Sequence, residues 1–124
     1  MPKIVLVADD SPMVRKSLCQ MFEMEPEYDL CAEAENGKEA IALAKEHRPD
    51  LIILDLSMPV MNGLEAAHEL KRIMPEIPII LFTVHSDLLM NKIGHLSVDL
   101  VVQKTDPNLM SYVRSLVPAE NASI

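Results

Sequence analysis

Short apolar runs recur five times along the chain, and longer segments with a different residue spacing separate them. The runs are almost continuous in Ile, Val and Leu, which is typical of strands buried on both faces of a sheet. They cover residues 3–8, 30–34, 51–54, 77–82 and 100–103. The pattern therefore predicts five short strands that lie inside the molecule.

The segments between the runs repeat their apolar residues at the spacing of amphipathic helices. Ser11 followed by Pro12 is a strong helix start, because serine caps the first turn and proline suits the first helical position. Asn62-Gly63 is a turn signal in front of another such segment. We expect helices at residues 12–22, 37–46, 64–73, 88–96 and 107–117.

Strand and helix alternate five times, which predicts an α/β fold. Right-handed crossovers between the strands then give a doubly wound parallel sheet with helices on both faces. The length of 124 residues fits one domain with a sizeable core. We find no repeat or linker, and we expect a single domain over residues 1–124, with its core at about 3–117 and a short tail at 118–124.

Charge and composition narrow the classes of function. The formal net charge is −8 and the basic residues are scattered, which argues against direct nucleic-acid binding by this domain. No apolar run approaches the roughly 18 residues that cross a membrane. The first residues lack the pattern of a signal peptide. We therefore expect a cytoplasmic protein that does not bind membranes.

Polar residues follow most of the apolar runs. Asp9 and Asp10 follow the first run, Asp55 the third, Thr83 the fourth and Lys104 the fifth. In a parallel sheet these ends share one edge, where ligands bind. Clustered carboxylates repel one another, and a magnesium ion, which prefers oxygen ligands, removes that conflict. A carboxylate can also accept a phosphoryl group, and an ammonium can hold its oxygens. The sequence thus predicts a site for a divalent cation and a phosphoryl group.

These motifs together resemble the receiver domain of bacterial two-component response regulators, of the chemotaxis-regulator type. The matching parts are Asp9-Asp10-Ser11, the stretch 54–63 (LDLSMPVMNG), Thr83 and Lys104, in that order along the chain. The resemblance covers about residues 3–117. It implies a flavodoxin-like, five-stranded parallel sheet of order 2-1-3-4-5 with five helices.

The resemblance also implies roles for the acidic residues. Asp55 would be the phosphoacceptor. Asp10, Asp55 and the backbone carbonyl of Ser57 would bind Mg²⁺ directly, and Asp9 would act largely through water. A sensor histidine kinase or a histidine phosphotransfer protein would donate the phosphoryl group. The domain would then be a phosphorylation-dependent signalling switch, not an enzyme in the usual sense, with an unknown downstream protein effector. The sequence leaves open a homodimer that forms on phosphorylation.

Further roles concern the phosphoryl group and its readout. Lys104, Thr83 and the backbone of Val84 would bind the phosphoryl group, and Thr83 would be the switch hydroxyl. Family members usually carry an aromatic residue three positions before the lysine, and here that position is Val101. We therefore do not expect the usual coupling of threonine to an aromatic ring. Val84 is bulkier than is common after the threonine, and we expect it to narrow access to the phosphoryl group.

Other classes of protein share parts of this pattern. A degenerate receiver that acts as a protein-binding module is one alternative, because of Val101. A magnesium-dependent aspartyl phosphatase of the haloacid-dehalogenase type is another, although it needs a second acid where this chain has Ser57. A flavodoxin-like FMN carrier needs a phosphate-binding loop after the first strand. Here the loop holds Asp9 and Asp10, which repel phosphate in the absence of a metal ion.

Overall fold

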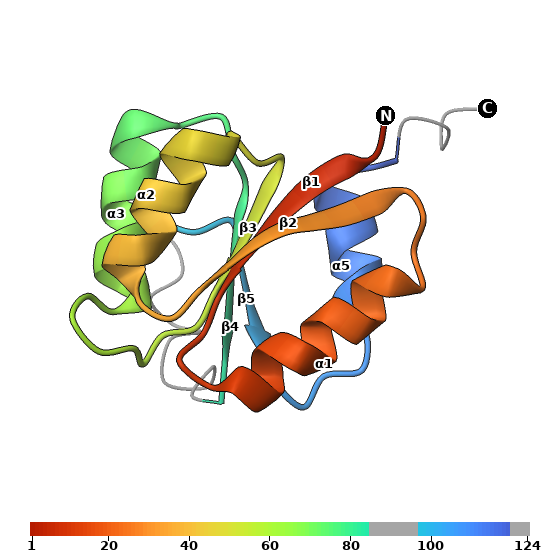
Figure 1. Cartoon of the computed structure of the whole chain (residues 1–124), viewed down its shortest axis with the longest axis horizontal. Helices are drawn as coiled ribbons and strands as arrows, with labels where there is room; N and C mark the ends of the chain where they lie inside the picture. The colour runs from red at the N-terminus through yellow and green to blue at the C-terminus, as the bar shows by residue number, and fades with distance from the viewer. Residues whose placement is uncertain (85–96, 120–124) are drawn as a thin grey trace.

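The computed structural model describes residues 1–84 and 97–119, and for Cys31 the backbone alone. Five strands form one sheet, and the helices in these residues cover both of its faces (Figure 1). The strands are β1 (Lys3–Ala8), β2 (Tyr28–Ala34), β3 (Leu51–Leu54), β4 (Ile79–Thr83) and β5 (Leu100–Gln103). The helices are α1 (Pro12–Glu23), α2 (Gly37–His47), α3 (Gly63–Ile73) and α5 (Leu109–Leu116).

The sheet is parallel throughout, with the order β2-β1-β3-β4-β5. This is the order that the resemblance implied. From β1 the chain continues to β2 on one side of β1, and then crosses to β3 on its other side. The direction in which strands are added therefore reverses between the neighbours β1 and β3. A crevice for ligands opens at such a point, beyond the carboxyl ends of the strands. The helix expected at residues 88–96 lies outside the described residues.

The fourth strand begins at Ile79, two residues later than the apolar run suggested. Pro78 interrupts the run because proline has no N–H to give to a neighbouring strand. Ile77 belongs to the preceding turn, where its N–H donates to the carbonyl of Met74 (3.2 Å). The strand also extends one residue further, so that Thr83 is its last residue.

The last helix begins at Leu109, two residues later than expected. Asp106 explains the delay, because its carboxylate accepts a hydrogen bond from the N–H of Asn108 (2.9 Å) and holds Pro107 in a turn. Helix α3, in contrast, begins at Gly63, one residue earlier than expected. Asn62 caps this helix in a reciprocal capping box with Glu65, and Gly63 is already helical.

The core consists of two apolar layers, one on each face of the sheet, because successive strand residues point to opposite faces. Figure 1 shows α2 and α3 on one side of the sheet and α1 and α5 on the other. Leu6, Ile52 and Leu81 belong to the layer under α2 and α3. Val7 and Phe82 belong to the layer under α1 and α5. In the described part of the chain, no helix is long and apolar enough to span a membrane.

The loop from β3 to α3 is packed closely against its surroundings. A Cβ atom on Gly63 would lie 2.1 Å from the carbonyl oxygen of Asp55, and one on Gly37 would lie 2.6 Å from that of Met61. Within this loop Val60 has a φ of 69°, and the N–H of Met61 donates to the carbonyl of Pro59 (2.7 Å). This is a γ-turn of the strained kind, with a β-branched residue at its centre.

We therefore expect Val60→Gly to stabilise the protein. Glycine adopts positive φ without a steric penalty, and the relief of strain should exceed the entropy that glycine adds to the unfolded chain. The free energy of unfolding should rise by about 1 kcal/mol in urea titrations. Val60→Thr keeps the branched Cβ and should bring no gain. A loss of stability in Val60→Gly would show that the turn is not strained.

Candidate functional site

Three carboxylates converge at the carboxyl ends of β1 and β3. Asp9 and Asp10 directly follow β1, and Asp55 directly follows β3, where its N–H donates to the carbonyl of Ala8 (2.8 Å). Carboxylate oxygens of the three residues lie within 4.8 Å of one another. Asp9 and Asp55 are buried, while Asp10 is exposed. The structure thus brings together the three acids that the sequence singled out.

Lys104 lies between the two buried acids. Its Nζ is 2.7 Å from Oδ2 of Asp9 and 3.2 Å from Oδ1 of Asp55. The backbone N–H of Lys104 donates to the carbonyl of Thr83 (2.9 Å), which fixes the residue at the end of β5 beside β4. The other oxygen of Asp9 accepts a hydrogen bond from the N–H of Ser11 (2.9 Å). The ammonium is therefore the main charge that balances the two buried carboxylates.

The environment shifts the acid–base behaviour of both partners. Burial raises the pKa of the Asp55 carboxyl, and the negative charge of Asp9 raises it further, while Lys104 offsets part of the effect. Burial alone would lower the pKa of Lys104. The hydrogen bond to Asp9 and the charge of Asp55 outweigh it, so that the pKa of the ammonium lies above its usual value. Lys104 thus remains charged, and the ionised form of Asp55 carries an energetic penalty.

The other residues singled out from the sequence differ in how deeply they are buried. Thr83 is buried at the end of β4, and Val84 after it has 52% of its surface exposed. Ser57 is exposed in the loop that follows Asp55. Val101 is buried in the layer under α2 and α3, opposite Leu81 of β4, and so belongs to the core.

Arg15 is a residue of the site region that sequence reasoning missed. It projects from α1, and its Nη1 donates to the backbone carbonyl of Asp9 (2.7 Å). The same guanidinium contacts Glu33 and Glu35, at the end of β2 and just after it. Its position one helical turn after Ser11 was only a weak indication that it lies near the site. Many basic residues occupy such positions on solvent-exposed faces of helices.

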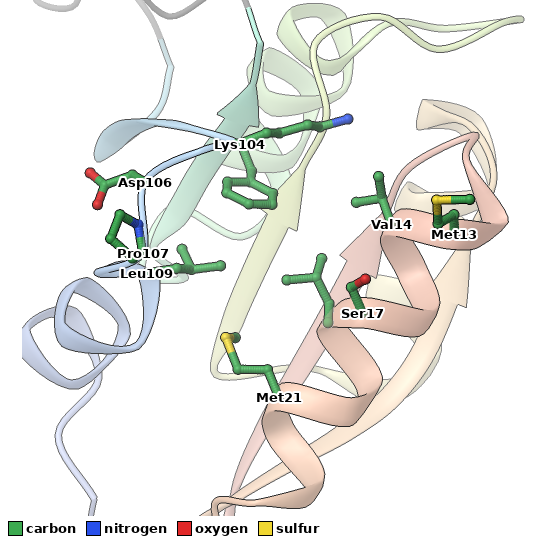
Figure 2. A pocket seen from close by; sticks show the side chains of 10 residues that line it. Met13, Val14, Ser17, Met21, Lys104, Asp106, Pro107 and Leu109 are labelled. Carbon is green, nitrogen blue, oxygen red and sulfur yellow. The ribbon is translucent and has the colours of Figure 1, made fainter.

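A pocket of about 350 Å³ adjoins the acidic cluster on the side of α1 and α5. Figure 2 shows Met13, Ser17 and Met21 on α1, across from the segment that runs from Lys104 to Leu109. Met13 is 78% exposed at its rim. Because Lys104 lines the pocket and also contacts Asp9 and Asp55, the pocket and the acidic cluster share a wall.

The donor set fits a hard divalent cation. All side-chain ligands that the three acids offer are carboxylate oxygens, which Mg²⁺ and Ca²⁺ prefer. When all groups are ionised, three carboxylates face one ammonium, which leaves a formal charge of −2. The exposed Asp10 gives such an ion a route from solvent, and an ion bound there can keep several of its waters.

Comparisons with known proteins identify the family of this chain. The family model of the response regulator receiver domain matches residues 5–112. The transcriptional regulatory protein PdtaR of Mycobacterium tuberculosis is 36% identical over 126 residues, which cover 95% of this chain and 55% of that protein. The nitrate/nitrite response regulator protein NarL of Escherichia coli is 42% identical over 83 residues, or 67% of this chain and 38% of that protein. The chain therefore spans about 38–55% of the length of these curated relatives.

Solved structures show the same similarity. The response regulator protein TrrA of Thermotoga maritima, determined in complex with Mg²⁺ and BeF, has a TM-score of 0.82 and 34% identity, and the match covers 93% of this chain and 99% of that one. A CheX–CheY–BeF₃–Mg²⁺ complex from Borrelia burgdorferi has a TM-score of 0.85 and 25% identity, over 94% and 90% of the two chains. With its acidic cluster at the carboxyl ends of β1 and β3 and a match over most of its length, this chain belongs to the family of response regulator receiver domains, the signalling domains of two-component systems.

Proposed function

We propose that the chain is a phosphorylation-dependent switch in a two-component phosphorelay, and that Asp55 is its phosphoacceptor. The observation that carries this proposal is the convergence of Asp9, Asp10 and Lys104 on the Asp55 carboxylate. The donor is a phosphohistidine on a sensor histidine kinase or a histidine phosphotransfer protein. The chain is a switch that takes part in its own phosphorylation and dephosphorylation, rather than an enzyme with a separate substrate.

In the transfer step, an Asp55 carboxylate oxygen attacks the phosphorus atom of the phosphohistidine. A P–O bond forms while the P–N bond breaks, and the imidazole nitrogen keeps the electron pair and is protonated by solvent. Such a transfer depends mainly on positioning and on neutralisation of charge. Lys104 is close enough to exchange its contact with Asp55 for one with a phosphoryl oxygen. The Thr83 hydroxyl and the backbone N–H of Val84 then donate to the other oxygens.

Mg²⁺ is the cofactor that we assign to the cluster, where it neutralises the phosphoryl oxygens when bound. Asp10, Asp55 and the backbone carbonyl of Ser57 would bind it directly, and Asp9 would act largely through water. The support from this structure is the set of three carboxylates within 4.8 Å, one exposed and two buried. A dication at this position also removes the repulsion between Asp9 and Asp55.

The output of the switch is a changed surface for a protein partner. We propose that Thr83 moves toward the phosphoryl group and that Val101, an aliphatic residue packed in the core, gives no rotating aromatic ring to report the move. The readout then depends on the backbone that follows β4. The partner is a protein effector or a second copy of the chain. The net charge of −8 supports a domain that does not contact nucleic acid by itself.

Acetyl phosphate with Mg²⁺ should phosphorylate Asp55 directly. Intact-mass analysis should show a labile adduct with the mass of one phosphoryl group, and Asp55→Asn should abolish it. Asp29→Asn is a matched control, because Asp29 is exposed on β2 and lies outside the acidic cluster. An adduct that persists in Asp55→Asn, or that never forms in the wild-type chain with Mg²⁺, would contradict the proposal. The latter result would favour the degenerate receiver.

Asp55→Asn should also stabilise the metal-free protein at neutral pH. The pKa of Asp55 is raised above its ordinary value of 3.8, so the folded state binds this proton more tightly than the unfolded chain does. The contribution of Asp55 to stability therefore falls as the pH rises above about 4. In EDTA at pH 7, the variant should melt about 4 °C higher, which corresponds to about 1 kcal/mol. The difference should vanish below about pH 4, and a variant that melts lower at pH 7 would contradict this account.

Val84→Ala should shorten the lifetime of the phosphorylated state. Val84 is half exposed next to Thr83, and its removal opens a path for the water that hydrolyses the acyl phosphate. We expect hydrolysis to become about threefold faster, measured by intact mass after acetyl phosphate is removed. Met24→Ala removes another exposed apolar side chain, at the far end of α1, and should leave the rate unchanged. Equal lifetimes in Val84→Ala and the wild-type chain would show that Val84 does not limit access.

A further inference from the structure

Arg15 connects three elements at the edge of the acidic cluster. Its Nη1 donates to the carbonyl of Asp9 (2.7 Å), and its Nε donates to Oε1 of Glu33 (3.2 Å). Its Nη2 lies 3.6 Å from Oε1 of Glu35. The Arg15 side chain is only 12% exposed. One guanidinium thus ties α1 to the chain that leaves β1 and β2.

The contact with Asp9 restrains the peptide that joins the two neighbouring acids. This carbonyl belongs to the same planar unit as the N–H of Asp10, so its direction also sets the direction in which the chain enters Asp10. Asp9 is held independently, since its N–H donates to Ala34 (3.0 Å) and its carboxylate accepts from Ser11 and Lys104. The Arg15 contact adds a restraint on the exposed acid, Asp10.

The charge of Arg15 is largely compensated where it lies. Glu33 and Glu35 face the same guanidinium, so this group of three side chains has no net positive charge. An arginine without acidic partners would compete with a cation for the carboxylates of the cluster. Because Arg15 is already paired with two glutamates, it acts mainly through the fixed geometry of its N–H donors. Loss of Arg15 would remove the restraint and leave two uncompensated carboxylates.

We propose that Arg15 is a positioning residue for the cation: it orients the Asp9–Asp10 peptide so that both carboxylates face the same ion. The inference rests on the proposed function, because it concerns the same acidic cluster. Contacts outside the ligands themselves commonly change metal affinity by about 10-fold to 100-fold when they are lost. The effect on stability need not follow the effect on affinity, and the two can be measured separately.

The test is Mg²⁺ affinity, measured by titration calorimetry at constant ionic strength, together with the melting temperature without metal. Arg15→Met should bind Mg²⁺ about tenfold more weakly than the wild-type chain, and Arg15→Lys should recover part of the loss. Arg72→Met is the matched control, because it removes an exposed, glutamate-paired arginine on α3 and should leave the affinity unchanged.

Two results would overturn the inference. If Arg15 acts only through its charge, Arg15→Met will bind Mg²⁺ more tightly than the wild-type chain. If Arg15 is merely structural, the melting temperature will fall while the affinity stays the same. Should Arg15→Met fail to fold, Arg15→Lys decides alone, and wild-type affinity in it would overturn the inference. Failure of the proposed function would give a different result. The wild-type chain would then not bind Mg²⁺, or Asp10→Asn would leave its Mg²⁺ affinity unchanged.

Discussion

The salt bridges of Lys104 to Asp9 and Asp55 are the interaction on which the site depends. Two buried carboxylates next to each other would be unfavourable without an opposite charge, so removal of the Lys104 ammonium would be costly. The ammonium reaches both, at 2.7 Å and 3.2 Å. Its backbone N–H donates to the carbonyl of Thr83 (2.9 Å), which anchors Lys104 at the end of β5 beside β4.

This arrangement fits the proposed response of the domain to a phosphoryl group. Lys104 alone does not balance three carboxylates. The pKa of Asp55 is raised first by burial and then by the charge of Asp9. In the proposed function, a divalent cation would supply the missing positive charge, and an oxygen of the phosphoryl group would offer Lys104 a new partner. Because Lys104 also lines the pocket between α1 and α5, a change at the acidic cluster also alters a wall of that pocket.

Much of the fold and the acidic cluster could be predicted from the sequence, because both follow from simple rules. Carboxyl ends of parallel strands share an edge, so Asp9, Asp10 and Asp55 lie near one another once β1 and β3 are neighbours. The order of the strands came from the family resemblance, since the pattern alone does not fix which strands are neighbours. The late start of β4 at Ile79 was predictable in principle, because Pro78 cannot donate to the ladder.

Other features depend on tertiary contacts that the sequence pattern does not contain. Val60 is among the residue types least suited to a positive φ, so its local preference points away from the observed turn. The close approach of Gly63 to the backbone of Asp55 imposes the path of this loop. The contacts of Arg15 could not be predicted for a related reason, since a long side chain can reach several acids and only the fold decides which. The helix expected at 88–96 lies outside the described residues.

A structure determined with Mg²⁺ and beryllofluoride tests the central claim most directly. We expect electron density for a cation between Asp10 and Asp55, a beryllofluoride group on Asp55, and Lys104 Nζ in contact with a fluorine instead of an Asp55 oxygen. The account would be contradicted if the ion bound elsewhere, or if beryllofluoride occupied Asp55 while Lys104 kept both of its present carboxylate contacts.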